Sequence, residues 1–181
     1  MNFGSITNTL ATLSLLCGGL GILLLILLLI PGARARIREE VAGQTALLLG
    51  LAWLVAAGAT GGSLYYSEAV GFVPCELCWW QRIAMYPLVL ILGVAALRSD
   101  RKVAWYGLPL SVVGLGIALY HVLIQFQPTL DVGMCDGGVP CTARYLSVFG
   151  FVSIPVMAAG GFLLITGLLA AALLDRTGSK P

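Results

Sequence analysis

The sequence predicts an all-α membrane protein, a polytopic bundle of helices that crosses the bilayer five times. Of its 181 residues, 59% are hydrophobic and only 10% are charged, a balance far from that of a water-soluble domain. A membrane span needs about 20 apolar residues, and such stretches occur at residues 9–30, 44–66, 81–97, 103–125 and 147–174. The connections are too short to fold independently, so we expect one compact bundle without a separate soluble domain.

The first span, residues 9–30, is interpreted as a membrane helix. The segment Ala33-Arg34-Ala35 after it is similar to a signal-peptidase site. However, the apolar run is longer than the roughly 7 to 15 residues of a signal peptide core, and no Lys or Arg precedes it. Cys17 within this span is expected to be a small buried apolar residue without a redox role.

The four later spans are rich in Leu, Ile, Val and Ala, with scattered glycines that let membrane helices approach closely. Amphipathic aromatic rings favour the headgroup level of a bilayer. Such residues gather near the expected span ends and are interpreted as anchors: Tyr65, Tyr66, Trp79, Trp80, Trp105 and Tyr106.

The distribution of Lys and Arg predicts the orientation, because short cytoplasmic loops carry the excess of positive charge. Basic residues follow the first, third and fifth spans: Arg34, Arg36, Arg38, Arg98, Arg101, Lys102, Arg176 and Lys180. Only Arg82 and Arg144 fall at the opposite ends of spans. We therefore expect a multi-pass protein of the plasma or inner membrane with its N-terminus outside and its C-terminus in the cytoplasm. The net charge of +2 and these short clusters give no support to nucleic-acid binding.

Four of the five cysteines fall in the two loops on the expected outer side. One loop leads into Cys75-Glu-Leu-Cys78, and the other contains Cys135-Asp-Gly-Gly-Val-Pro-Cys141. Disulfides form and persist outside the cytoplasm. The positions of the cysteines and those of the basic residues therefore indicate the same orientation.

A Cys-x-x-Cys pair opens and closes as a disulfide, and a helix N-terminus stabilises its thiolate. Pro74 and the apolar run from Trp79 place Cys78 at such a helix start. Arg82 follows four residues later on the same face, where its charge would favour the Cys78 thiolate and negative charge on a reducible ligand. The alternative for Arg82 is an interfacial side chain that reaches toward the headgroups.

The second pair, Cys135 and Cys141, brackets a turn-rich stretch. Closing so short a loop contributes only roughly 2 kcal/mol of stability. This favours a disulfide that is repeatedly broken and reformed, with an exposed structural disulfide as the alternative.

His121 is the only histidine and lies about one turn below the outer end of the fourth span. An ionisable group at membrane depth is a candidate functional residue. Gln125, one turn above on the same face, suggests the alternative of a hydrogen-bonded polar pair. Together, two dithiol pairs beside a membrane suggest a relay that passes electrons from an external thiol protein to a quinone.

Three segments together resemble the disulfide bond formation protein B family (DsbB), especially its BdbC-type branch: Pro74-Cys75-Glu-Leu-Cys78-Trp-Trp-Gln-Arg82, Tyr120-His121 and Cys135-Asp-Gly-Gly-Val-Pro-Cys141-Thr. The resemblance implies a four-helix thiol:quinone oxidoreductase core at 44–174. Such a core reoxidises a DsbA-like thioredoxin-fold thiol oxidase and reduces ubiquinone or menaquinone. Residues 1–43 would then be an extra N-terminal helix with a basic loop, and residues 175–181 a cytoplasmic tail.

The same resemblance implies roles for the site residues. Cys78 would lie beside the quinone with Cys75 as its partner, Cys135 would form the mixed disulfide with the thiol protein, and Cys141 would bridge to Cys75. By the same likeness, two further residues would lie at the quinone site: Arg82 and His121. The first span has no counterpart in the four-helix form. The second pair is also more closely spaced than in the best-known enterobacterial type, which leaves its division of roles open.

Three alternatives remain at the level of the sequence. A vitamin K epoxide reductase-like quinone reductase would carry its loop cysteines before the Cys-x-x-Cys, whereas here Cys75 and Cys78 come first. A zinc protein would use all four loop cysteines as ligands in a closed, redox-silent site. A scaffold with two structural disulfides would keep any activity after alkylation or reduction.

Overall fold

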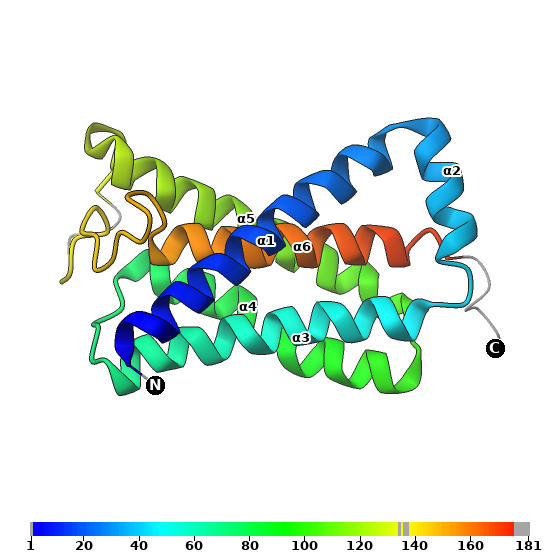
Figure 1. Cartoon of the computed structure of the whole chain (residues 1–181), viewed down its shortest axis with the longest axis horizontal. Coiled ribbons are helices and arrows are strands. Elements are labelled where there is room, and N and C mark those ends of the chain that lie inside the picture. The colour runs from blue at the N-terminus through cyan, green and yellow to red at the C-terminus, as the bar shows by residue number, and fades with distance from the viewer. Residues whose placement is uncertain (1, 134, 136–137, 176–181) are drawn as a thin grey trace.

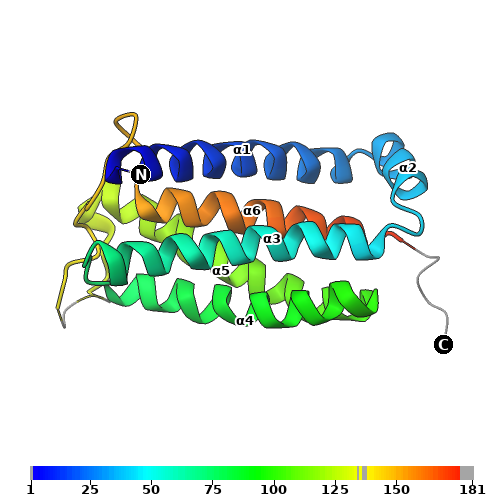
Figure 2. The same ribbon diagram turned by 60° about the horizontal axis from the view of Figure 1, so that its bottom comes forward.

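Five long helices run side by side in the computed structural model, which describes residues 2–133, 135 and 138–175 (Figures 1 and 2). They are α1 Phe3–Leu29, α3 Thr45–Leu64, α4 Glu76–Arg98, α5 Ala104–Phe126 and α6 Ile154–Ala172. A π-helical segment, Tyr65–Ala69, extends α3. All five are long and apolar enough to cross a membrane. The predicted all-α membrane bundle is therefore confirmed.

Helix α6 is the centre of the bundle and packs against α1, α3 and α5. Its Phe162 is fully buried and lies over Gly114 of α5, where an added Cβ would overlap the ring. Close to this contact, the hydroxyl groups of Ser111 and Thr166 are 2.8 Å apart and link the two helices. Small residues and interhelical hydrogen bonds are the usual means of association where lipid supplies no hydrophobic driving force.

Helix α1 lies on the side of α6 away from α4 (Figure 2). A Cβ at Gly21 would lie 2.6 Å from the backbone carbon of Leu163, and a Cβ at Gly160 would overlap the backbone oxygen of Ser14. Glycine is therefore required at both positions for the observed approach of the two backbones. The rotation of α1 about its own axis is fixed by these contacts.

Helix α2, Pro31–Glu40, occupies the segment that was predicted to be a basic loop. Proline is favourable in the first turn of a helix, and the following Ala, Arg and Glu residues have high helix propensity. The sequence did not indicate that this connection is helical, because the hydropathy pattern identifies membrane spans and overlooks a polar helix.

The fifth span begins later than its apolar run suggested. Residues 147–153 form a tight reversal in which Val148 and Val152 exchange two backbone hydrogen bonds of 3.0 and 2.9 Å. Phe149 and Gly150 adopt positive φ angles of 54° and 83° within it. Hydrophobicity alone does not reveal this turn, so the predicted start at residue 147 lies seven residues before the observed one at Ile154.

The two ends of the bundle differ in character. The loops that carry the two cysteine pairs lie at the end where α1 begins, and α2 lies at the other (Figure 1). The described basic residues that follow the first and third spans belong to the α2 end: Arg34, Arg36, Arg38, Arg98, Arg101 and Lys102. Arg176 and Lys180, and the tail after Asp175, lie outside the described residues.

Candidate redox site

The first cysteine pair lies at the beginning of α4. Cys75 is the N-cap residue, with extended backbone angles of −74° and 174°, and Cys78 lies within the first turn. Their sulfur atoms are 2.9 Å apart. Cys78 thus lies at the helix start, as the sequence predicted, and Cys75 caps the helix. The apolar run from Trp79 does not reveal that polar Glu76 already belongs to the helix.

Cys75 is the residue whose thiolate this arrangement stabilises. The hydrogen bond from the Cys78 thiol is the largest contribution that lowers the pKa of Cys75, and His121 adds a hydrogen bond and a favourable electrostatic interaction. Burial opposes both, since only 6% of Cys75 is exposed. The resulting pKa of Cys75 is about 4. In the dithiol state, Cys75 is therefore a thiolate at neutral pH and Cys78 is its hydrogen-bond donor.

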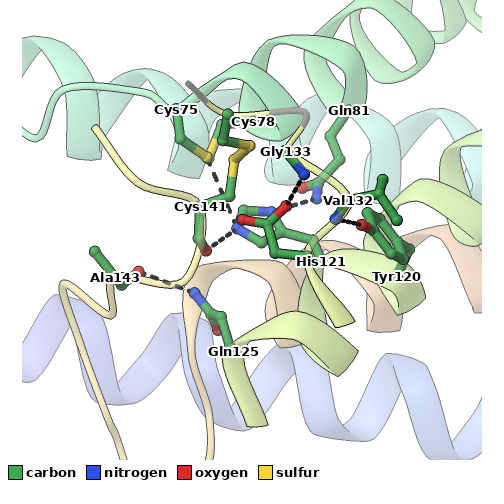
Figure 3. Close-up of a disulfide and its surroundings, with 12 residues drawn as sticks. Cys75, Cys78, Gln81, Tyr120, His121, Gln125, Val132, Gly133, Cys141 and Ala143 are labelled. Carbon is green, nitrogen blue, oxygen red and sulfur yellow. Dashed lines mark hydrogen bonds between the residues drawn. A yellow bond between two sulfur atoms is a disulfide. The ribbon is translucent and has the colours of Figure 1, made fainter. Parts of the chain in front are cut away.

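His121 is buried among the cysteines and connects three elements (Figure 3). Its Nδ1 lies 3.1 Å from Nε2 of Gln81. Because the Gln81 amide nitrogen is a donor, Nδ1 accepts and Nε2 carries the proton. Nε2 then donates to the carbonyl oxygen of Cys141 at 3.0 Å and lies 3.7 Å from the sulfur of Cys75.

The expected partner of His121, Gln125, has a different task. Its amide nitrogen donates to the carbonyl oxygen of Ala143 at 3.1 Å, and its amide oxygen accepts from Ser153 at 2.6 Å. The suggested pairing of His121 with Gln125 was wrong, because the ring turns toward α4 and meets Gln81. Gln81 was not identified from the sequence, although its position three residues after Cys78 places it one turn further along α4.

The second cysteine pair is closed as a disulfide between Cys135 and Cys141. Cys141 is fully buried, whereas Cys135 is partly exposed. The sulfur atoms of Cys75 and Cys141 and a ring nitrogen of His121 lie within 4.8 Å of one another. One sulfur of each pair is thus close to the other pair.

Aromatic side chains hold the second loop against the rest of the bundle. The hydroxyl group of Tyr145 donates to the carbonyl oxygen of Val73 at 3.0 Å, and its ring stacks on Phe72 with centroids 4.6 Å apart. On α5, the hydroxyl oxygen of Tyr120 accepts from the backbone nitrogen of Val132 at 3.3 Å. These contacts bring the two cysteine-bearing loops together.

An apolar cavity of about 350 Å³ lies on the other side of Cys78. Cys78 and Arg82 both line it. The guanidinium group of Arg82 donates to Ser63 of α3, with 3.0 Å from Nε to the hydroxyl oxygen and 3.2 Å from Nη2 to the carbonyl oxygen. It also lies over the ring of Trp79, 5.1 Å from the centroid. Trp79, which the sequence indicated as an anchor with a share in a ligand pocket as the alternative, thus also contacts the arginine.

Arg82 and His121, which the family resemblance placed together at a quinone site, line different spaces. Arg82 lines the large cavity, whereas His121 lines a second, much smaller space of about 20 Å³ together with Cys75. Cys78 borders both. Cys17 is partly exposed and also lines the large cavity, a position that the sequence gave no reason to expect.

The arrangement of the sulfurs also bears on the zinc alternative. Cys135 and Cys141 are bonded to each other, so in this state they are not thiolates and the four cysteines do not form a four-thiolate site. Cys75, His121 and Cys141 lie close enough together to share an ion. The sulfur of Cys141 would be a thiolate ligand only after its disulfide is reduced.

Residues 44–173 match the family described as disulfide bond formation protein DsbB. The chain belongs to this family. It is 52% identical over 135 residues to a probable disulfide formation protein of Oceanobacillus iheyensis, covering 74% of this chain and 92% of that protein. It is 49% identical over 114 residues to disulfide bond formation protein C of Bacillus subtilis, covering 62% and 83%. No solved structure is significantly similar.

Membership of the DsbB family assigns the chain to the disulfide-forming oxidoreductases of the membrane. The same match disfavours the vitamin K epoxide reductase-like alternative. It begins at residue 44, so α1 and α2 precede the part of this DsbB-family chain that is shared with the family.

Proposed function

We propose that this protein is a thiol:quinone oxidoreductase. It oxidises an extracytoplasmic, DsbA-like thioredoxin-fold dithiol and passes the two electrons to ubiquinone or menaquinone in the membrane. One observation carries the proposal: the four sulfurs form a series from a partly exposed position to an apolar cavity. Cys135 lies at the loop surface, Cys141 and Cys75 are buried side by side, and Cys78 lines the cavity.

The first step takes place at the second loop. A thiolate of the partner attacks the sulfur of Cys135, the Cys135–Cys141 bond breaks, and Cys141 leaves as a thiolate. The second thiol of the partner then attacks the mixed disulfide, which releases the oxidised partner and the Cys135 thiol. Exposure favours Cys135 over the fully buried Cys141 as the sulfur that is attacked.

The second step transfers the electrons between the pairs. The Cys141 thiolate attacks Cys75 in the Cys75–Cys78 disulfide, and Cys78 is released. Cys135 then attacks Cys141, which restores the Cys135–Cys141 disulfide and expels Cys75. A sulfur with a low pKa is a good leaving group, and the pKa of Cys75 is about 4. Both electrons are then held by Cys75 and Cys78, the state described here.

The third step uses the cavity. The Cys75 thiolate attacks the sulfur of Cys78 while an electron pair passes from Cys78 to the quinone. The products are the Cys75–Cys78 disulfide and a quinol, whose two protons come from the Cys78 thiol and from water. The cavity suits this substrate because it is apolar, has a volume typical of ligand sites, and presents the cation of Arg82 where negative charge develops.

The charge distribution supports the proposed orientation. Cytoplasmic loops carry the excess of Lys and Arg, so the basic α2 end would lie inside and the cysteine loops outside. In this orientation the redox site is on the face where disulfides persist. A membrane-impermeant thiol reagent added to intact cells after mild reduction is expected to label Cys135, and protection of all four loop cysteines would reverse the orientation.

The decisive experiment is anaerobic. The purified full-length protein is mixed with a reduced thioredoxin-fold dithiol and a soluble quinone analogue, and quinone absorbance and free thiols are followed together. Two thiols lost for each quinone reduced is the expected result. No quinone reduction, with one tightly bound zinc ion per chain, would instead favour the metal site.

A further inference from the structure

Helix α1 lies outside the family match and yet borders the cavity beside Cys78. The 135 matched residues make up 92% of the Oceanobacillus iheyensis relative, which leaves less than a tenth of that protein unmatched. This remainder is too short to contain a helix as long as α1, which has 27 residues. One wall of the cavity is therefore formed by a helix that the shorter sequence of that relative cannot contain.

Four residues of α1 form this wall, and they share one face of the helix. Their spacing of three, four and seven residues from the first is that of neighbours on a helical surface: Leu10, Leu13, Ser14 and Cys17. The contacts of Gly21 and Gly160 with the facing backbones hold this face toward α6, and Leu10 lies beside Gly62 of α3. These contacts fix which face of α1 lines the cavity.

The cavity extends from the redox centre to the surface that faces lipid. Cys78 and Arg82 of α4 line its inner part. Leu13 of α1 and Leu54 of α3 also line it, and they are 52% and 57% exposed. Both are apolar residues on membrane-spanning helices, so the cavity opens between α1 and α3 toward the hydrocarbon of the bilayer.

We propose that α1 forms the binding site for the isoprenoid tail of the quinone, with Leu13 and Cys17 as determinants of specificity. This inference rests on the proposed function. It places the quinone ring at α4 and the isoprenoid tail at α1. The ring must reach Cys78 to accept electrons, and Arg82 provides its polar contact. The apolar tail then has a route to the bilayer along α1 and out between Leu13 and Leu54.

The test compares two quinones that share a ring. One is 2-methyl-1,4-naphthoquinone, and the other carries a prenyl chain on the same ring. In Leu13→Trp and Cys17→Trp, the larger side chains fill the tail route. We expect KM for the prenylated quinone to rise about tenfold, which corresponds to about 1.4 kcal/mol of binding free energy. KM for the tail-less ring and for the thiol partner is expected to stay within about twofold.

Matched controls lie on the lipid-facing side of the same helix. Leu16 and Leu23 are 58% and 53% exposed and do not line the cavity. Leu16→Trp and Leu23→Trp add similar bulk to α1, so they report any general effect on folding or insertion. Both are expected to retain the wild-type KM for the two quinones.

A measurement on the unmodified chain avoids the risk of misfolding. When both redox pairs are oxidised, Cys17 is the only free thiol among the five cysteines. The prenylated quinone is expected to slow its alkylation by N-ethylmaleimide at least about fivefold, and the tail-less ring to have little effect.

The outcomes separate this inference from the proposed function. If the wild type reduces quinone but neither tryptophan variant alters KM and no protection of Cys17 is found, α1 does not bind the tail while the oxidoreductase proposal stands. If the wild type reduces neither quinone, the oxidoreductase proposal fails and the assignment of α1 fails with it.

Discussion

The two cysteines at the start of α4 lie three residues apart but face very different surroundings. Cys75 faces a small space that His121 and Gln125 also line, and its sulfur lies close to that of Cys141. Cys78 borders that space and also the large apolar cavity with Arg82. One turn of helix thus joins a site suited to thiolate chemistry with a site suited to a lipid-soluble acceptor. The two side chains are chemically identical, so any difference in their reactivity comes from their surroundings.

The largest effect is expected where the two surroundings meet. Cys78→Ser removes the sulfur that borders both spaces, so steady-state turnover should fall to the background rate. The variant should still form a mixed disulfide with the thiol partner through Cys135, detected as a shifted band on a non-reducing gel. Normal turnover in Cys78→Ser would contradict the relay.

A smaller effect is expected on the cavity side alone. Arg82→Gln keeps a hydrogen-bonding group near Ser63 but removes the positive charge that would face the developing negative charge. Charge-assisted contacts contribute about 1.5 to 3 kcal/mol, so kcat/KM for the quinone should fall roughly 10- to 150-fold. Oxidation of the partner in a single turnover without quinone should stay near the wild-type rate. Arg144→Gln, a change to the arginine over Phe126 outside the large cavity, serves as the matched control.

In the small space beside Cys75, His121→Phe is expected to change how the rate of Cys75 alkylation depends on pH. His121 is the second cause, after Cys78, of the low pKa of Cys75. In the reduced wild type, the Cys75 thiolate is present above about pH 4, so the rate of its alkylation should be nearly constant from pH 5 to 8. Without His121 the pKa of Cys75 rises, and the rate should fall within this range as the pH is lowered.

The control for this experiment is Gln125→Leu. Gln125 bonds Ala143 and Ser153, so its loss should loosen the second loop and leave the alkylation profile of Cys75 unchanged. A shifted profile in Gln125→Leu together with an unshifted one in His121→Phe would reverse the assignment of these two side chains.

The smallest effect is expected at Cys17. Cys17→Ser changes one atom in the wall of the cavity and leaves its shape nearly intact, so turnover with a prenylated quinone should remain within about twofold of the wild type. This variant also removes the fifth thiol and simplifies thiol counting. A severe loss would give Cys17 a redox role that no contact described here supports.

The spans and the cysteine pairs were predictable because they depend on local composition. About 20 apolar residues identify a membrane helix without any knowledge of its neighbours. Contacts between helices were not predictable in the same way. The spacing within α5 suggested Gln125 as the partner of His121, but the packing of α4 against α5 provides Gln81 instead. A spacing rule describes only one helix, so it cannot identify a partner on another.

The position of α1 illustrates the same limit. Its sequence predicts a membrane helix with a cysteine at its middle, but which face turns inward depends on Gly21 and Gly160. The start of α4 was missed for a different reason. Glu76 is polar, and a search for apolar runs excludes the first turn, which places Cys75 at the N-cap.

The chain holds one cysteine pair as a disulfide while the other is a dithiol. On the proposed relay, the protein can thus store two electrons after the thiol partner has left and before a quinone has arrived. The two substrates never need to be bound at once, and each half-reaction regenerates the form that the other requires. Initial rates plotted in double-reciprocal form against either substrate should then give parallel lines.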